Sequence, residues 1–386
     1  MKRLAIITSH PIQYNAPWFK LLAKRKNLAV KVFYTWGQSE KDTKYDPGFA
    51  KNVKWDIPLL EGYEYRFVNN ISEEPGSHHF KGIYNPTLIK EIEQWNPDAI
   101  LVFGWNFKSH LKVIRYFKGK NRIIFRGDST LLDEGISFSL KKNLRRVFLR
   151  WVYRHVDKAL YVGTANREYY RALGLKNDQL VFAPHAIDNN RFMQDRQHDV
   201  RKQLGIPIEE IVFLFAGKFE EKKNPSFLLE SFIQSGLKNA HLLMVGNGHL
   251  ETILKNKVLE QNLDFRRRIH FIDFQNQSKM PEIYQTCDVL VLPSQGPGET
   301  WGLAVNEAMA SGKAVLVSNK CGCAADLIQE GINGYVFESN NKEDLIKKMN
   351  QFSLQKASLR IMGNQSLQII QDWSFQKICE AIEQSI

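Results

Sequence analysis

The sequence predicts an α/β protein made of two doubly wound, Rossmann-like parallel sheets that face a cleft. Short apolar runs rich in β-branched residues alternate with longer helical patterns almost from end to end. This alternation is typical of parallel strands covered by helices on both faces. The chain also has 386 residues, too many for one ordinary hydrophobic core, which favours two domains.

Ten apolar runs are the expected strands. In the first half they are 4–8, 30–34, 99–103, 122–125 and 159–162, and in the second half 212–216, 241–245, 269–272, 289–292 and 314–317. Residues 17–24 fit a helix with Asn15 as its cap and Pro17 in its first turn. In such folds ligands bind at the carboxyl ends of the strands, which is where candidate site residues are sought.

A polar run at 189–198 separates the two series of strands. We therefore expect an amino-terminal domain over residues 1–188 and a carboxy-terminal domain over residues 189–372. The last segment, 373–386, has a helical pattern and is expected to pack back on the first domain.

Composition narrows the class of protein. Hydrophobic residues make up 43% and charged residues 24% of the chain, as in a soluble globular enzyme rather than a disordered protein. The four cysteines form no disulfide framework, and Cys321 and Cys323 lack the spacing of a zinc site. The first apolar run ends at His10, and no run approaches the roughly 20 apolar residues of a spanning helix. We expect a cytoplasmic protein that uses no metal.

The net charge is +12, and the segment 141–155 carries a conspicuous part of it. Four arginines there alternate with Phe148, Trp151 and Tyr153, so a helix would have a basic face beside an aromatic one. Such a helix suits an anionic membrane surface. Two alternatives stay open: a core-packing helix with a basic exposed face, and a nucleic-acid surface, for which no recognition motif is present.

The run ETWGLAVNEAMASG, at 299–312, places Glu299 eight residues before Glu307. It follows a buried strand, and helical sequence begins near Leu303. A helix N-terminus at a strand end presents free amides and a positive dipole end, which suit a phosphate. Carboxylates on either side of that phosphate would hold hydroxyl groups of a sugar and a ribose. The alternative is that Glu299 caps the helix and Glu307 lies on a solvated face.

Lysines follow the strand 212–216. Gly217 allows a tight turn, and Lys218 and Lys223 then lie at the carboxyl end of that strand. Two cations there would neutralise a diphosphate and the charge that grows on it as it leaves. The alternative is a solvated lysine-rich loop.

Two further strand ends carry weaker signals. Gly246 and Gly248 follow the strand 241–245, and glycines at such a turn let a phosphate or sugar approach the backbone closely. The third glycine of a dinucleotide fingerprint is missing, which argues against a Rossmann dehydrogenase. Phe274, after the strand 269–272, is a candidate to seat a nucleobase.

Together these segments resemble the retaining glycosyltransferases of family 4, of the bacterial surface-glycan type, which have the GT-B fold. The matching pieces are APHAIDNNRF, GKFEEKKNPSFLLESF, LLMVGNGHLETIL, CDVLVLPSQGPGETWGLAVNEAMASGKAVLVSN and EGINGYVF, in the family's order. The resemblance covers most of residues 181–337, and the pair of glutamates with both lysines is its most specific part.

The resemblance implies roles for individual residues. Glu299 matches the residue that holds donor-sugar hydroxyls, and Glu307 matches the carboxylate that binds the ribose. Lys218 stands where the family more often has Arg, which keeps the charge but loses the bidentate fork, and Lys223 matches its partner lysine. The backbone amides expected to bind the donor phosphates are those of Thr300, Trp301, Gly302 and Leu303.

The first half matches less closely. Residues 9–19 are similar to the first-strand loop of one branch of the family but lack its Gly-Gly pair. His10 and Asp128 are the catalytic candidates at strand ends, with Arg126, Trp105 and His110 as weaker cleft candidates. Each histidine has the alternative of a structural, hydrogen-bonded role, and Asp128 that of a turn or cap residue.

As a function, the resemblance implies transfer of a sugar, with retention, from a nucleotide diphosphate-sugar to a hydroxyl of a glycan or lipid-linked acceptor. No cofactor or metal is expected beyond this co-substrate, and no nucleic-acid partner. The expected context is cell-surface polysaccharide biosynthesis in the cytoplasm, peripheral on the inner face of the membrane. The alternatives are a nucleotide-sugar epimerase of the same architecture and a non-enzymatic basic protein that binds membrane or nucleic acid.

Overall fold

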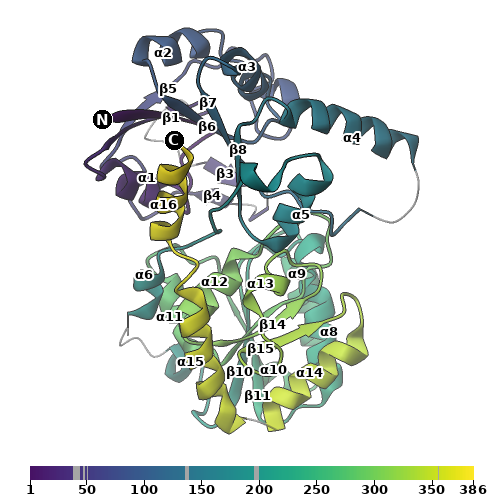
Figure 1. Ribbon diagram of the computed structural model, residues 1–386. Helices are drawn as coiled ribbons and strands as arrows, with labels where there is room; N and C mark the ends of the chain where they lie inside the picture. Colours follow the sequence, from purple (N-terminus) through teal and green to yellow (C-terminus); the bar gives the residue numbers. More distant parts are fainter. Residues whose placement is uncertain (38–43, 47, 50, 135–138, 195–199, 355) are drawn as a thin grey trace. The chain divides into compact units, whose positions relative to one another are not determined.

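The computed structural model describes residues 1–386 except 38–43, 47, 50, 135–138, 195–199 and 355 (Figure 1). The chain divides into two compact units. The first contains Met1–Asp42, Pro58–His185 and Phe375–Ile386, and the second contains Thr43–Ile57 and Ala186–Ser374. Each unit is built around one parallel sheet.

The sheet of the first unit has seven strands in the order β5-β2-β1-β6-β7-β8-β9, all parallel. Five consecutive residues of β1 are buried, as expected for a strand covered on both faces. The strands are β1 (Lys2–Thr8), β2 (Leu28–Tyr34), β5 (Glu64–Phe67), β6 (Ala99–Phe103), β7 (Arg122–Arg126), β8 (Lys158–Tyr161) and β9 (Leu180–Phe182).

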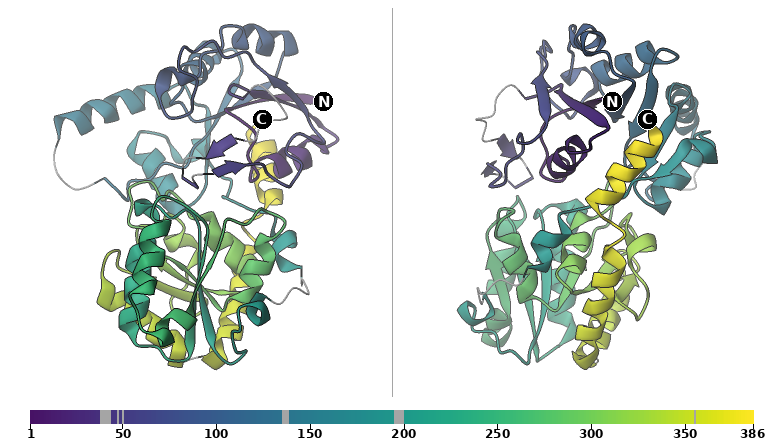
Figure 2. Two further views of the ribbon diagram at one scale, coloured as in Figure 1. Left: turned by 180° about the vertical axis from the view of Figure 1, so that it is seen from behind. Right: turned by 60° about the vertical axis from the view of Figure 1, so that its left-hand side comes forward.

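Six α-helices accompany this sheet among the described residues: α1 (Ala16–Ala23), α2 (Leu88–Trp95), α3 (Lys108–Phe117), α4 (Leu140–Tyr153), α5 (Thr164–Ala172) and α16 (Phe375–Ser385). The last of these lies beside α1 (Figure 2). The Cys379 thiol of α16 donates to the Trp18 carbonyl at 3.8 Å. The guanidinium of Arg25, which follows α1, donates to the side-chain oxygen of Gln376 at 3.0 Å. The carboxyl end of the chain is thus part of the first unit.

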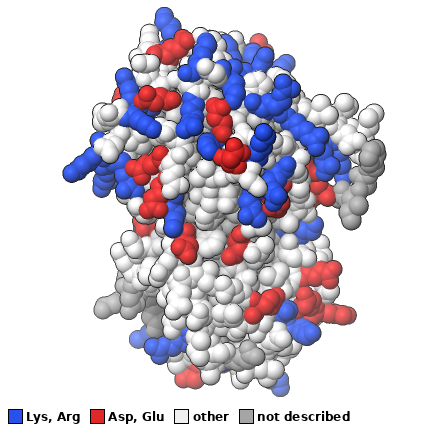
Figure 3. Space-filling model, viewed as in Figure 1, with Lys and Arg blue, Asp and Glu red and all other residues white. Residues whose placement is uncertain are grey.

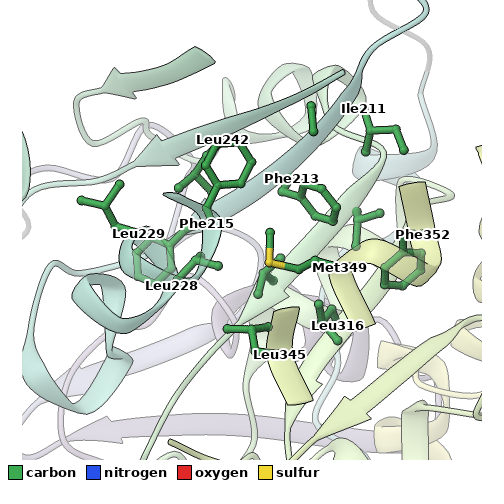
Figure 4. Packing of buried hydrophobic residues seen from close by; sticks show 14 of the residues in the cluster. Ile211, Phe213, Phe215, Leu228, Leu229, Leu242, Leu316, Leu345, Met349 and Phe352 are labelled. Carbon is green, nitrogen blue, oxygen red and sulfur yellow. The ribbon is translucent and has the colours of Figure 1, made fainter. Parts of the chain in front are cut away.

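The sheet of the second unit has six parallel strands in the order β12-β11-β10-β13-β14-β15. They are β10 (Ile211–Ala216), β11 (Ala240–Val245), β12 (Ile269–Ile272), β13 (Val289–Leu292), β14 (Ala314–Ser318) and β15 (Gly334–Phe337). Side chains such as Phe213, Leu242 and Leu316 fill the core together with Met349 and Phe352 of α14 (Lys342–Leu354) (Figure 4).

The other α-helices described in this unit are α6 (Asn189–Met193), α7 (Val200–Gln203), α8 (Pro225–Ser235), α9 (Glu251–Leu259), α10 (Leu263–Arg268), α11 (Met280–Thr286), α12 (Leu303–Ala310), α13 (Ala324–Leu327) and α15 (Leu359–Ile370). The antiparallel pair β3 (Lys44–Asp46) and β4 (Lys51–Val53) also belongs to this unit, although it comes from the first half of the sequence.

The two parallel sheets are as expected, and all ten predicted strands are present within two residues of their predicted ends. The sequence analysis missed β5, β9 and β15, which lie at the edges of the sheets. Both β5 and β9 are only partly buried: β5, with the sequence EYRF, lacks the continuous apolar run that reveals a central strand, and β9, with the sequence LVF, is only three residues long. Asn15 precedes α1 as expected, but its side chain makes no capping hydrogen bond.

Candidate functional site

Four neighbouring strands of the second unit carry the predicted site residues just beyond their carboxyl ends. Lys218 and Lys223 follow β10, Gly246 follows β11, Phe274 follows β12 and Glu299 follows β13. In a parallel sheet all these ends lie at one edge, where open α/β sheets bind their ligands. The topology therefore brings segments that are far apart in sequence to one side of the sheet.

Buried Glu299 and partly buried Lys223 form an ion pair at this edge. The ammonium of Lys223 donates to Oε2 of Glu299, and the Ser294 hydroxyl donates to the same oxygen at 2.8 Å. The Glu299 side chain is only 8% exposed, and no side-chain cap is made at the start of α12. The alternatives of a solvated lysine loop at Lys223 and a capping role for Glu299 are therefore wrong.

The helix α12 begins directly after this pair. Gly302 precedes it with φ of +108°, and a Cβ there would lie 2.7 Å from the Leu292 side chain, so only glycine fits. The first amides of a helix have no partner within it and lie at the positive end of its dipole. The N-terminus of α12, whose amides and dipole suit an anion, thus stands next to Glu299. The Trp301 side chain is buried and donates to Asn306 at 2.8 Å, so it helps to fix this turn.

Glu307 lies one turn into α12 and is also buried. The Tyr284 hydroxyl, from α11, donates to its Oε2 at 2.8 Å. The alternative of a solvated helix face is wrong for this residue. A buried carboxylate that keeps a hydroxyl partner is suited to accept further hydroxyl groups, such as those of a ribose.

Gly246 and Gly248 have a structural explanation that the sequence analysis did not foresee. Their φ values are +143° and +156°, and added Cβ atoms would meet the Gly217 carbonyl oxygen at 1.9 Å and the Phe219 backbone at 2.5 Å. The close approach for which glycine is needed is therefore made by the protein's own loop after β10. Contact of these glycines with a donor stays a prediction.

Lys218 has a different carboxylate partner from Lys223. Its ammonium lies 2.8 Å from Oδ1 of Asp46, in the hairpin from the first half of the sequence, and 5.0 Å from the ring centre of Phe49. The Phe49 ring in turn lies 4.7 Å from the ring of Phe274, the predicted nucleobase seat. Trp55 approaches the same ring at 6.2 Å. The hairpin segment thus adds the Asp46 carboxylate and the rings of Phe49 and Trp55 to the carboxyl ends of these strands.

The candidates in the first unit are less connected to one another. The imidazole of His10 lies 3.0 Å from the Ser9 hydroxyl and edge-on to Trp36. Asp128, about half exposed, lies 3.6 Å from Nε2 of His185. Burial lowers the pKa of His185, and the nearby Asp128 opposes this effect. These two residues form a pair that could exchange a proton.

Two of the weaker candidates are structural. The buried guanidinium of Arg126 donates to the carbonyls of Ala183 and Pro184 at 2.8 and 2.9 Å, and burial lowers its pKa to about 10. His110 is fully buried, and its Nδ1 lies 2.8 Å from the Phe103 carbonyl, which can only accept. The third, Trp105, packs edge-on against Phe148.

Sequence reasoning missed Ser294, Tyr284, His185 and Asp46. Ser294 lies in the same loop as Glu299, so its position after β13 was a usable signal. The role of Tyr284 depends on the packing of α11 beside α12, which no local pattern reveals. The same holds for Asp46, which is 172 residues from Lys218 in sequence.

The described residues also bear on metal binding and membrane spanning. They contain no group of three or more His, Cys, Asp or Glu residues arranged to hold a metal ion. None of the helices in the described part of the chain combines the length and apolar character needed to cross a membrane. A shallow cavity of about 660 Å³ beside α15 is lined by Ile332, Ile361 and Met362 and includes none of the site residues.

Solved structures define the class of fold. A crystal structure of HepE from Anabaena in complex with UDP superimposes with a TM-score of 0.72 at 18% identity, covering 100% of this chain and 99% of that one. The GT-B fold expected from the sequence, with two parallel-sheet α/β units, is thereby confirmed.

The sequence comparisons match parts of the chain to glycosyltransferases. Residues 196–368 match the family model of glycosyl transferases group 1. A lipopolysaccharide 1,2-N-acetylglucosaminetransferase from Salmonella typhimurium is 25% identical over 211 residues, 53% of this chain and 55% of that protein. An N,N'-diacetylbacillosaminyl-diphospho-undecaprenol alpha-1,3-N-acetylgalactosaminyltransferase from Campylobacter jejuni is 25% identical over 227 residues, 57% of each protein. The chain thus spans about half the length of these curated relatives.

Proposed function

We propose that the protein is a retaining glycosyltransferase that moves a sugar from a nucleotide diphosphate-sugar to a hydroxyl of a glycan or lipid-linked acceptor. The observation that carries this proposal is the ion pair of Lys223 with buried Glu299 at the start of α12, with buried Glu307 one turn further on. It lies inside residues 196–368, the part of the chain that matches the glycosyl transferase model.

In the proposed reaction the bond between the anomeric carbon and the donor phosphate oxygen breaks, and its electron pair leaves with the diphosphate. The acceptor oxygen forms its new bond on the same face of the sugar, and its proton passes to the departing phosphate. Lys218, Lys223 and the amides at the start of α12 stabilise the growing negative charge. Glu299 orients the sugar hydroxyls, and Glu307 holds the ribose.

Because these cationic groups stand where a divalent ion would otherwise act, we propose that transfer needs no metal. The test is turnover in the presence of a chelator. Activity that disappears with chelator and returns with Mg²⁺ or Mn²⁺ would contradict this part of the proposal and leave the rest standing.

The donor is the first property to measure. A panel of UDP-, GDP- and dTDP-sugars is tested for binding by calorimetry, and the tightest donor is then incubated with the protein alone. Binding without conversion of the free sugar supports a transferase that waits for an acceptor. Conversion of the donor sugar in the absence of acceptor would instead identify an epimerase, and absence of binding across the panel would contradict both.

For the acceptor side we propose that α4 places the protein on an anionic membrane. Figure 3 shows Lys and Arg side chains gathered over the first unit. On α4 the apolar side chains of Leu140, Leu144, Val147 and Phe148 are exposed by 75, 64, 63 and 40%. They recur at the spacing of one helix face, between basic residues, which suits a helix lying in the membrane interface.

The aromatic face expected on this helix differs from the exposed apolar face observed. Tyr153 is buried, and Trp151 packs against Phe148 and Arg115, so aliphatic residues form most of the exposed apolar surface. We expect Leu144→Ser to weaken sedimentation with vesicles that contain phosphatidylglycerol. Ile361→Ser is the matched control, because Ile361 is 62% exposed on α15 of the other unit. Equal binding to neutral phosphatidylcholine vesicles would contradict an anionic partner.

A further inference from the structure

The hairpin of β3 and β4 is anchored on the second unit by contacts that do not involve Lys218. Lys51 donates to Asn247 at 2.8 Å and lies 3.1 Å from a carboxylate oxygen of Asp273. Both oxygens of Asp56 accept from the Ser278 amide, at 3.1 and 3.2 Å. These contacts hold the hairpin beyond the ends of β11 and β12, and they do not depend on the contact between Asp46 and Lys218.

One residue of this anchored hairpin, Asp46, meets a predicted phosphate-binding group. Its Oδ1 lies 2.8 Å from the ammonium of Lys218 and also accepts from the Gly48 amide at 2.9 Å and the Phe49 amide at 3.3 Å. Burial alone would raise the pKa of Asp46, but the hydrogen bond and charge of Lys218, together with the backbone hydrogen bonds from Phe49 and Gly48, outweigh it and lower the pKa below its usual value. The carboxylate is therefore ionised and held in place by the backbone of its own turn.

A carboxylate in this position has the chemistry of a phosphate oxygen. It is an anion, it accepts hydrogen bonds from the ammonium, and it lies at the strand end where a diphosphate is proposed to bind. If a diphosphate met Lys218 while Asp46 stayed in contact, two anions would share one cation and repel each other. Lys218 can therefore neutralise either the Asp46 carboxylate or the diphosphate fully, but not both.

We propose that Asp46 is an internal counter-ion of the donor site, which occupies Lys218 when the site is empty and is exchanged for the donor's diphosphate. This inference rests on the proposed function. The exchange needs no departure of the hairpin, because Lys51 and Asp56 hold it independently. It needs only rotation of the Lys218 side chain, which is 31% exposed and has a flexible stem. Asp46 is thus a positioning residue that tunes donor affinity.

The test is the affinity for UDP and for inorganic pyrophosphate, measured by calorimetry on the full chain. Asp46→Asn removes the competing charge but keeps an acceptor for Lys218, so we expect both probes to bind about fivefold more tightly or better. In a Lys218→Ala background the Asp46→Asn change should leave the affinity for both probes unchanged, because the cation for which the two anions compete is absent. Weaker or equal binding by the Asp46→Asn protein would overturn the proposal, and so would tightening that persists without Lys218.

Asp56→Asn is the matched control. It removes the same charge from the same segment, but its carboxylate contacts Ser278 and not Lys218. Equal tightening in both variants would assign the effect to a loosened hairpin or to long-range charge, and would overturn the role of Asp46. If neither probe binds the unmodified protein or the Asp46→Asn protein, the proposed donor site fails together with this inference. If the unmodified protein binds UDP and only the effect of Asp46 is absent, the proposed function stands.

Discussion

The predicted polar site residues differ between the two units in their burial and in their partners. In the second unit Glu299 and Glu307 are buried and Lys223 is partly buried, and each has a charged or hydroxyl partner beside the N-terminus of α12. In the first unit Asp128 is about half exposed, and His10 has a serine and a tryptophan as neighbours. Buried, partnered polar groups are costly to arrange and therefore mark a preformed site. If the proposed function holds, the difference predicts a donor half built in advance and an acceptor half that the acceptor itself completes.

The largest effect is expected at the ion pair of Lys223 with buried Glu299. Lys223→Ala removes the cation that we propose stabilises the leaving group, and we expect kcat to fall by about 10²- to 10³-fold, as for the loss of one oxyanion donor. It also leaves Glu299 buried without its cation, which should lower the free energy of unfolding by about 3 kcal/mol. Turnover and denaturant unfolding are measured on the same preparation.

The adjacent Lys222 supplies the control for that experiment. It is 39% exposed and pairs with Glu220, so Lys222→Ala should change both quantities little. The double variant Lys223→Met, Glu299→Gln should recover part of the stability but no activity, since the unpaired charge is gone. Full activity in either Lys223 variant would contradict a preformed site in the second unit.

A second prediction concerns stability in acid and tests whether His110 of the first unit is structural. Burial lowers the pKa of His110 from 6.5 to about 4. Because the unfolded chain takes up the proton more readily, the stabilisation is present above pH 6.5 and is lost as the pH falls toward 4. The expected loss is about 3 kcal/mol. Thermal unfolding followed between pH 7 and 4 measures it.

His110→Gln, which cannot titrate, should be less stable at pH 7 but lose less stability on acidification. His270 in the second unit has a similarly lowered pKa of about 4 and is unchanged in both proteins, so it cancels in the comparison. If the stability of the two proteins falls in parallel between pH 7 and 4, His110 does not titrate in this range. That outcome would contradict a structural role that depends on its buried, neutral imidazole.

A smaller effect is expected at Glu307. Glu307→Ala removes the predicted ribose contact but no group at the bond that breaks, so donor affinity should fall about tenfold while kcat changes little. The control is Tyr284→Phe, which removes the hydroxyl that donates to Glu307 and keeps the ring. A drop in kcat with unchanged KM for the donor would place Glu307 in the chemical step instead of in binding.

The sequence was informative where a motif is local and buried. The run from Glu299 to Glu307 and the lysines after β10 lie in continuous segments, so spacing and strand ends were sufficient to predict them. The role of Asp46 could not be predicted from the sequence, because its contact partner Lys218 lies 172 residues away. The contact also depends on a hairpin that belongs to the second unit, although the chain before and after it belongs to the first. The glycines 246 and 248 show a different limit: the need for glycine was predicted, but its close contact with the protein's own backbone was not foreseen, and contact with a donor stays a prediction.

An effect of similar size is expected at Asp128, and it tests the proposed acceptor half. If Asp128 and His185 form a proton-exchanging pair for the acceptor, Asp128→Asn should leave donor binding unchanged and lower transfer by about tenfold. The same variant removes the charge that opposes the lowered pKa of His185, so the acidic limb of the pH–rate profile should shift to lower pH. Glu168→Gln, at an exposed ion pair of the same unit, is the control. An unchanged pH profile with reduced donor binding would mean that the first unit contributes to the donor site, and the contrast between the units would fail.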